Sequence, residues 1–314
     1  MEKYAIIPDS ACDLTKDLRD RFGITDYLPG VMYFPDGRTL PADLDWNIIS
    51  PRDYFSSMSS NAPLYKTAAC PMGDISAIFE KHLAAGEDVL SICLSSGLSS
   101  TYNDCISIGK ELMKKYPGRK VICVDSQRYS TALGLLVVSS SLKREEGLSI
   151  EENAAFLEQE KYRIHQSGIM DDLFFLVKTG RISNFKAFFG SLIGINLTAD
   201  FNHNGICEVL SRFKGKSTAL EAVVRYMERT IHDADKQIIF VAHSNREAIA
   251  KTLADMIATR IKPKEIIINS VGMSCGASIG PGLCAAFYKG DPISQDLTVE
   301  HGIMDAITNE LKSR

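Results

Sequence analysis

The stretch that decides the fold reads Asp88-Val89-Leu90-Ser91-Ile92-Cys93-Leu94-Ser95-Ser96-Gly97-Leu98-Ser99-Ser100-Thr101-Tyr102. Residues 89–94 are mostly apolar, which is typical of a strand covered on both faces. Residues 95–101 then supply four serines, one threonine and one glycine before a helix that we expect to begin near Ser99. Backbone N–H groups at a helix start, with hydroxyls beside them, favour a carboxylate or a phosphate. The alternative is that Ser99 or Ser100 simply caps the helix.

Two other predicted strands also end in polar residues. Asp9-Ser10 follows the strand at residues 4–8, and Asp125-Ser126 follows the strand at residues 120–124. In open α/β sheets, ligands bind beyond the carboxyl ends of the strands. We therefore expect these two pairs to converge with Ser95-Ser96 on one crevice, and the alternative for each pair is helix capping.

Strands and helices alternate around these strand ends. Amphipathic patterns at residues 74–83 and 101–116 predict helices that cross over between parallel strands. Residues 131–142 are so apolar that their helix must be buried. A further helix is expected from residue 150 to about 167, and we place a domain boundary there. The predicted domains are an N-terminal α/β domain over residues 1–160 and a second α/β domain over residues 161–314.

The remaining patterns predict scaffold. We expect a hairpin over residues 31–40, a helix over residues 51–59, and a loop without regular structure over residues 62–74. In the second half, strands are predicted at residues 205–213, 237–242, 265–271 and 283–288, and helices at residues 218–232, 246–261 and 298–311.

Composition argues against several function classes. The 314 residues include Lys+Arg 35 and Asp+Glu 39, and a net charge of -4 gives no electrostatic footprint for nucleic acid. No apolar run approaches the roughly 20 residues of a membrane-spanning helix, and no signal segment is visible, so we expect a cytoplasmic protein. The cysteines form no Cys-x-x-Cys pair and the histidines no zinc pattern. We expect core thiols and no metal site.

A resemblance to a known family rests on motifs spread over nearly the whole chain. These are Asp9-Ser10 with Asp13-Leu14, the Thr67 loop ending in Gly73-Asp74, Ser95-Ser96-Gly97-Leu98-Ser99 followed by Thr101-Tyr102, Val124-Asp125-Ser126, Leu173 to Leu176 before Gly180-Arg181-Ile182, and Gly280-Pro281-Gly282. Each motif is weak alone. Their order and spacing together resemble the DegV family of fatty-acid-binding proteins.

The resemblance implies a two-domain α/β fold that encloses a long-chain fatty acid in a tunnel between the domains. It implies a binding subunit rather than an enzyme, with no catalytic residues and no cofactor, whose bound carboxylate is phosphorylated by a separate fatty acid kinase subunit. Carried over by position, the ligand-binding residues are Thr67, Ser95, Ser96, Ser278 and Gly280. Arg181 is then expected near the pocket mouth or at the kinase, and Arg212 is a weaker candidate for the same docking face.

The chain departs from the family pattern at three places. Ser278 stands where the family commonly has histidine, Ala68-Ala69 follows Thr67 where serine and glutamine are usual, and Ile195-Asn196-Leu197 stands where lysine and proline often lie. Ser278 can donate a hydrogen bond but cannot carry positive charge. A carrier or sensor of a different amphiphilic acid therefore stays open. Gly280 either brings backbone close to the head group or forms only a tight turn.

An apolar stripe is consistent with a lipid. The spacing of Phe185, Phe188, Phe189, Leu192 and Ile193 is helical, and residues 132–138 offer a second apolar wall, although most such stripes are ordinary core. About 14 methylenes of a palmitate-sized chain provide roughly 11 kcal/mol before binding costs, whereas each hydrogen bond to a charged head provides about 1.5–3 kcal/mol. We expect apolar burial to set affinity and hydroxyls to set position.

A hydrolase is the other alternative. It requires Ser96 or Cys70 as nucleophile and His243 as base, but the serine-rich turn lacks a Gly-x-Ser-x-Gly elbow. His243 follows a predicted strand, where a local hydrogen bond is the simpler role.

Overall fold

The computed structural model describes residues 3–182 and 195–313. Contacts divide the chain into two compact units: Met1–Ile48, Pro63–Lys161 and Gly272–Ala277 form unit 1, and Ile49–Ala62, Tyr162–Val271 and Ser278–Arg314 form unit 2. Each unit therefore takes a segment from the other half of the chain, and the two are described separately. The predicted boundary at 160/161 concerns domains that fold on their own, and it stays a prediction.

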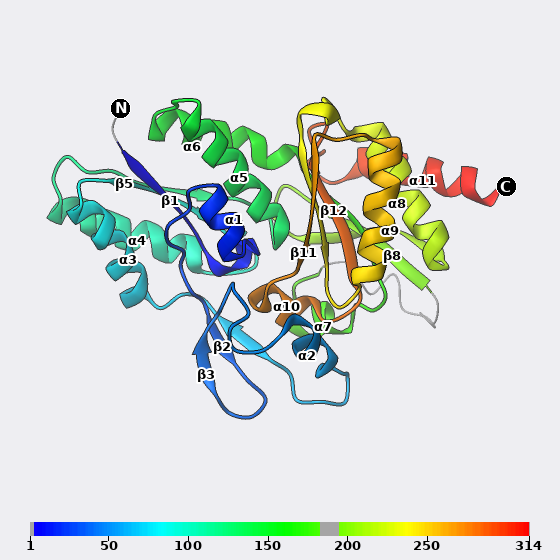
Figure 1. Ribbon diagram of the computed structural model, residues 1–314, viewed down its shortest axis with the longest axis horizontal. Coiled ribbons are helices and arrows are strands. Elements are labelled where there is room, and N and C mark those ends of the chain that lie inside the picture. The colour runs from blue at the N-terminus through cyan, green and yellow to red at the C-terminus, as the bar shows by residue number, and fades with distance from the viewer. Residues whose placement is uncertain (1–2, 183–194, 314) are drawn as a thin grey trace. The chain divides into compact units, whose positions relative to one another are not determined.

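Unit 1 is centred on a parallel sheet with the strand order β1-β5-β6 (Figure 1). The strands are β1 (Tyr4–Pro8), β5 (Asp88–Cys93) and β6 (Val121–Asp125). Pairing runs from Tyr4↔Asp88 to Pro8↔Ile92 and from Val89↔Val121 to Cys93↔Asp125, so all three carboxyl ends lie at one edge. The predicted parallel sheet is confirmed.

Helices follow the strands of unit 1, as the alternation predicts. They are η1 (Ser10–Cys12), α1 (Lys16–Arg21), α3 (Met72–Ala84), α4 (Thr101–Lys115), α5 (Thr131–Glu145) and α6 (Ile150–Glu160), with α10 (Met273–Ile279) spanning the change of unit. The predicted buried helix is confirmed in α5, because its residues 131–138 are all buried. Gly134 permits this packing, since a Cβ there would lie 2.3 Å from the carbonyl oxygen of Cys12.

A small antiparallel sheet in unit 1 has the order β3-β2-β4. The hairpin predicted over residues 31–40 is confirmed as β2 (Val31–Tyr33) and β3 (Thr39–Pro41). The loop predicted over residues 62–74 is wrong at its centre, where β4 (Lys66–Ala68) pairs with β2. Three residues are too few to show a period-2 pattern, and their partner strand is distant in the sequence.

Unit 2 contains a sheet with the order β11-β10-β12-β7-β8-β9. Its strands are β7 (Ile164–Met170), β8 (Ile195–Phe201), β9 (Cys207–Lys214), β10 (Ile238–His243), β11 (Glu265–Ser270) and β12 (Leu283–Lys289). Its helices are α2 (Pro51–Ser56), α7 (Phe174–Thr179), α8 (Lys216–Thr230), η4 (Ala234–Lys236), α9 (Glu247–Arg260) and α11 (Thr298–Lys312), and η2 (Lys161–Arg163) begins at the change of unit. The four strands predicted in this half are confirmed.

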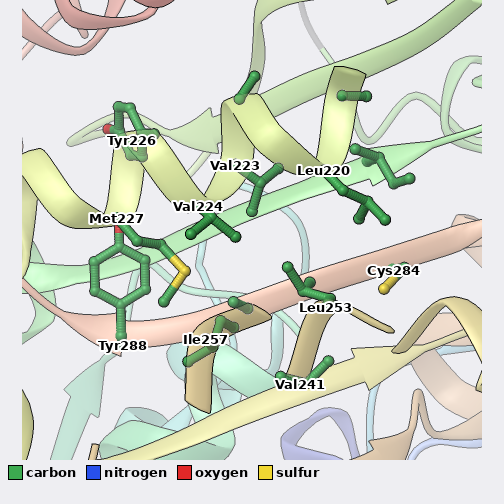
Figure 2. Packing of buried hydrophobic residues seen from close by; sticks show 14 of the residues in the cluster. Leu220, Val223, Val224, Tyr226, Met227, Val241, Leu253, Ile257, Cys284 and Tyr288 are labelled. Carbon is green, nitrogen blue, oxygen red and sulfur yellow. The ribbon is translucent and has the colours of Figure 1, made fainter. Parts of the chain in front are cut away.

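The core of unit 2 lies between helices and sheet (Figure 2). Helix α8 contributes Leu220, Val223, Val224 and Met227 at helical spacing, and they pack with side chains from α9, β10 and β12. Leu253 and Ile257 of α9, Val241 of β10 and Cys284 of β12 are all 0% exposed. An apolar core of this kind stabilises the unit without fixing a function.

The helix predicted from residue 150 to about 167 is wrong in its last part. Helix α6 ends at Glu160, and residues 164–170 form β7 between β12 and β8. The polar residues of β7 conceal a strand pattern, but all of them are buried in the sheet. His165 Nδ1 lies 3.1 Å from Asp200 Oδ2, and its Nε2 lies 2.9 Å from the carbonyl oxygen of Asp291. Neighbouring strands therefore override the local pattern.

The structure adds a strand, β8, that the sequence pattern does not predict. The aromatic stripe of Phe185, Phe188, Phe189, Leu192 and Ile193 lies outside the described residues. Among the helices within residues 3–182 and 195–313, none has the length and hydropathy of a bilayer-spanning segment.

Gly168 in β7 tests the packing of this sheet. A Cβ at Gly168 would lie 2.2 Å from the Cβ of Ala285 and 2.6 Å from the carbonyl oxygen of Cys284. We expect Gly168→Ala to lower the free energy of unfolding by about 2–3 kcal/mol, because strand backbone must move. Gly302→Ala in α11 is the matched control, since a Cβ there meets nothing within 4 Å. It should raise stability by about 0.5–1 kcal/mol. Equal urea midpoints for the two variants contradict this packing.

Candidate functional site

Asp9 joins the carboxyl ends of β1 and β5. Its Oδ1 accepts a hydrogen bond of 2.9 Å from the N–H of Ala11, and its Oδ2 accepts one of 2.8 Å from the N–H of Leu94. The first bond caps η1, so the capping interpretation of Asp9 is confirmed. The second bond holds the turn after β5, so Asp9 also connects the ends of two parallel strands.

Asp125 joins the carboxyl ends of β5 and β6. Its Oδ1 accepts from the N–H of Ser96 at 3.1 Å and from the N–H of Gln127 at 3.0 Å. Its Oδ2 accepts from the Ser96 hydroxyl at 2.6 Å. The strand ends at Asp9, Ser96 and Asp125 therefore do converge, as the sequence predicts.

A third carboxylate, Asp13, extends this edge but was not among the predicted site residues. Its Oδ1 accepts from the N–H of Gly272 at 2.9 Å, and its Oδ2 accepts from the hydroxyls of Ser130 and Thr131. Asp13 lies four residues after Asp9 in the sequence, which is the only local signal for its role. Its partners come from distant segments of unit 1.

Burial changes the titration of two of these carboxylates. Asp9 is 4% exposed and Asp13 is 2% exposed. Removal from water raises the pKa of each carboxyl group from 3.8 to about 6, and the hydrogen bonds that each accepts only partly offset the effect. Asp9 and Asp13 therefore titrate closer to neutral pH than an exposed aspartate does.

The three hydroxyls predicted to bind a head group in unit 1 have different surroundings. Ser95 is buried, and its Oγ accepts from the N–H of Gly97 at 3.2 Å. Ser96 is exposed. Thr67 is half-buried on β4 opposite Met32, and its hydroxyl makes no hydrogen bond within the described part of the chain.

The turn that follows uses its hydroxyls locally. Ser99 Oγ accepts from the N–H of Thr101 at 3.3 Å, and Ser100 Oγ donates to Asp104 Oδ2 at 2.9 Å. Ser100 is the N-cap residue of α4 but makes no capping bond with its side chain. The capping interpretation is therefore wrong for Ser100, and Ser99, which precedes the N-cap, makes a local turn bond instead.

The remaining predicted residues belong to unit 2. Ser278 is 4% exposed near the end of α10. Gly280 has φ +71°, and a Cβ there would lie 2.1 Å from the ring of Phe175, so packing alone requires glycine. Arg181 is half-buried and donates to the carbonyl oxygen of Thr179, whereas Arg212 is exposed on β9.

The groups of the hydrolase alternative are not activated. Burial raises the pKa of Cys70 to about 12, which leaves a thiol rather than a thiolate at neutral pH. His243 Nδ1 accepts from the N–H of Arg246 at 3.4 Å, and burial lowers its pKa. The neutral ring then carries its proton on Nε2, so neither nitrogen is available as a base. Ser96 donates to Asp125 instead of to a histidine.

The cysteines are thiols, as composition predicts. Cys123 is partly buried and the other seven cysteines are buried, all as free thiols. Within the described residues, no group of three or more His, Cys, Asp or Glu side chains is placed to hold a metal ion.

Fold and site together define an α/β protein of two-domain type, with carboxylates and hydroxyls at the carboxyl edge of a parallel sheet. A family model described as "Uncharacterised protein, DegV family" matches residues 3–290. A DegV domain-containing protein of Clostridium perfringens is 30% identical over 291 residues, which are 93% of this chain and 99% of that protein. The chain belongs to the DegV family, as its motifs predict.

Solved structures agree with this assignment. A DegV family protein from Thermus thermophilus, whose structure is described as "Fatty Acid Binding of a DegV family Protein", is 25% identical to this chain. Its TM-score is 0.81 over 91% of this chain and 99% of that one. A DegV lipid binding protein from Thermotoga maritima is 23% identical, with a TM-score of 0.78 over 92% and 98% of the two chains. The predicted two-domain DegV-like fold is confirmed.

The buried carboxylates give a testable titration. The folded chain holds protons on Asp9 and Asp13 up to about pH 6, whereas the unfolded chain releases them near pH 4. Their contribution to the free energy of unfolding is therefore fully present below about pH 4 and is lost as the pH rises through about 6. Carboxyl ¹³C chemical shifts should show both groups titrating near pH 6. Exposed Asp36 is the control, because hydrogen bonds lower its pKa below 3.8. Midpoints near pH 4 for Asp9 and Asp13 contradict their burial.

Proposed function

We propose that this protein binds a long-chain fatty acid and holds its carboxyl end with hydroxyls. The observation that carries the proposal is the Ser96 turn, which Asp9 and Asp125 fix at the carboxyl edge of the parallel sheet. An exposed hydroxyl on a rigid turn can position a polar head without ordering any backbone. The relative from Thermus thermophilus, which is named for fatty acid binding, supports the same ligand class.

We further propose Thr67, Ser95, Ser96, Ser278 and Gly280 as the ligand-binding residues. Thr67 is the clearest of these, because its hydroxyl is half-buried and makes no hydrogen bond within the described residues. Ser95 is 0% exposed and shapes the turn. The enclosing tunnel stays a prediction from the family resemblance, as does the role of residues 132–138 as an apolar wall.

The finer proposal is that the protein presents the bound carboxyl group to a separate fatty acid kinase subunit. It is supported by the family resemblance and by an exposed cation, Arg212, on the outer strand β9. Arg181 is the second docking candidate, although its guanidinium already donates to the carbonyl oxygen of Thr179. The protein itself is then a binding subunit without catalytic residues.

A carrier of a different amphiphilic acid is the second candidate function. It is favoured by Ser278, which is buried and cannot supply the positive charge of the histidine that is usual in the family. Native mass spectrometry of the purified protein separates the two candidates. A bound mass in the long-chain fatty acid range supports the first, and a polar phosphorylated metabolite contradicts it.

The hydroxyls can be tested together. We expect Thr67→Ala with Ser96→Ala to weaken palmitate binding by about tenfold to a hundredfold, because two hydrogen-bonding partners of the head group are removed. Thermal stability should fall only slightly, since Thr67 has no hydrogen bond in the described chain and water can replace the exposed Ser96 hydroxyl at Asp125 Oδ2. Isothermal titration calorimetry and a melting curve check both statements.

Ser100→Ala is the matched control for this double variant. It also removes an exposed hydroxyl that donates to a carboxylate, Asp104, from the same stretch. Its palmitate affinity should equal that of the wild type. Unfolding of the double variant shows instead that the two hydroxyls are structural.

The docking face can be tested separately from acid binding. We expect Arg212→Glu to reduce transfer of phosphate to the bound acid by about tenfold, because charge reversal disfavours the docked complex, while palmitate affinity stays unchanged. Lys264→Glu is the control, since Lys264 is an exposed cation preceding β11, at the opposite edge of the same sheet from β9. Equal transfer rates for wild type and both variants, measured with a fatty acid kinase subunit and ATP, contradict the docking role of Arg212.

A further inference from the structure

The two oxygens of Asp125 have separate tasks. Oδ1 accepts both backbone N–H groups, those of Ser96 and Gln127, while Oδ2 accepts only the Ser96 hydroxyl, at 2.6 Å. A serine hydroxyl has one proton and two lone pairs. Because that proton points to Asp125, the exposed side of the Ser96 oxygen offers lone pairs only.

The charge of Asp125 acts in the same direction, whereas the buried guanidinium of Arg128 donates to the carbonyl oxygens of Gln127 and Lys161. The Asp125 carboxylate forms no salt bridge with the described residues, and Asp9 lies at the adjoining turn, where it accepts from the N–H of Leu94. Lys161 Nζ donates to the backbone carbonyl of Asp125 at 3.0 Å and to Glu158 Oε2 at 2.6 Å. The Glu158 carboxylate therefore offsets the positive charge of Lys161. Nearby Tyr102 is neutral, because burial first and the Asp125 charge next raise its pKa. A second anion beside Asp125 is disfavoured by like-charge repulsion.

We propose that Asp125 makes Ser96 a hydrogen-bond acceptor for the ligand, so that the head group contacting Ser96 is a neutral donor: the protonated acid rather than its anion. This inference rests on the proposed function and adds the protonation state that the site selects. The residue acts through Ser96, so Asp125 is a positioning residue. The direction in which the Ser96 hydroxyl donates, rather than the number of hydroxyls in the turn, then determines whether the ligand must donate or accept.

Neutral ligands of equal chain length test the direction of the hydrogen bond. Hexadecanol can donate to Ser96, whereas methyl palmitate can only accept. We expect the wild type to bind hexadecanol about tenfold more tightly than methyl palmitate, the scale of one net hydrogen bond. Palmitic acid should bind more tightly below its own pKa than above it, relative to hexadecanol at the same pH. That ratio removes effects of pH on the fold that act on both ligands alike.

Asp125→Asn inverts the bond while keeping its shape. The asparagine oxygen can still accept the two backbone N–H groups, but its NH₂ group replaces Oδ2 and donates to Ser96. The Ser96 proton is then free for the ligand, so the preference for hexadecanol over methyl palmitate should fall at least about tenfold or reverse. In the Ser96→Ala background the same substitution should leave the preference unchanged, because the coupling passes through that hydroxyl.

The outcomes separate this inference from the function on which it rests. Tight palmitate binding without a preference between the two neutral ligands, and without the pH dependence, overturns the role of Asp125 but leaves fatty acid binding intact. Failure of all three ligands to bind the wild type overturns the proposed function itself. If Asp125→Asn does not fold, as judged by its melting curve, the wild-type comparisons still decide the question.

Discussion

The carboxyl edge of the parallel sheet depends on buried carboxylates that accept hydrogen bonds from backbone N–H groups. Asp9 binds the N–H of Leu94, and Asp125 binds the N–H of Ser96, so each carboxylate connects the end of one strand to the turn after its neighbour. Placing a carboxylate away from water is unfavourable, and hydrogen bonds from N–H donors offset part of that effect. Neither side chain forms a salt bridge with the described residues. The edge is therefore rigid and rich in acceptors, which restricts what can bind there.

That restriction changes the meaning of the serine-rich turn. Counted from the sequence, its hydroxyls suggest a donor surface for an anion. In the structure, Ser96 donates to Asp125, Ser100 donates to Asp104, and Ser95 is buried. The convergence of the strand ends is predictable because parallel pairing alone imposes it. The direction of each hydroxyl is not, since it depends on a carboxylate 29 residues away from Ser96 in the sequence.

The same distinction explains how much of the fold can be predicted. Strands and helices with a clear apolar pattern are visible in the sequence: β5 and residues 131–138 of α5 are apolar runs that are buried on all sides, and α8 has one apolar side. Strand β7 is not, because its buried His165 pairs with Asp200 of a neighbouring strand, and a buried polar residue looks exposed when its partner is unknown. β4 is too short to show any period. Segments that belong to the unit built mainly from the other half of the chain, such as Gly272–Ala277, carry no local signal of that membership.

Residues carried over from a family by position can reflect packing as well as binding. Gly280 is required by its positive φ and by the ring of Phe175, whatever the ligand. Arg181 already donates to the carbonyl oxygen of Thr179 near the end of α7. Thr67 differs from both, because the fold uses its backbone in β4 but leaves its half-buried hydroxyl without a hydrogen bond in the described chain. A polar group removed from bulk water and unused by the fold is the kind of group that a ligand satisfies. Thr67 can turn its proton freely, whereas Asp125 fixes that of Ser96, so in the proposed site the two hydroxyls suit a head that both donates and accepts, as an undissociated acid does.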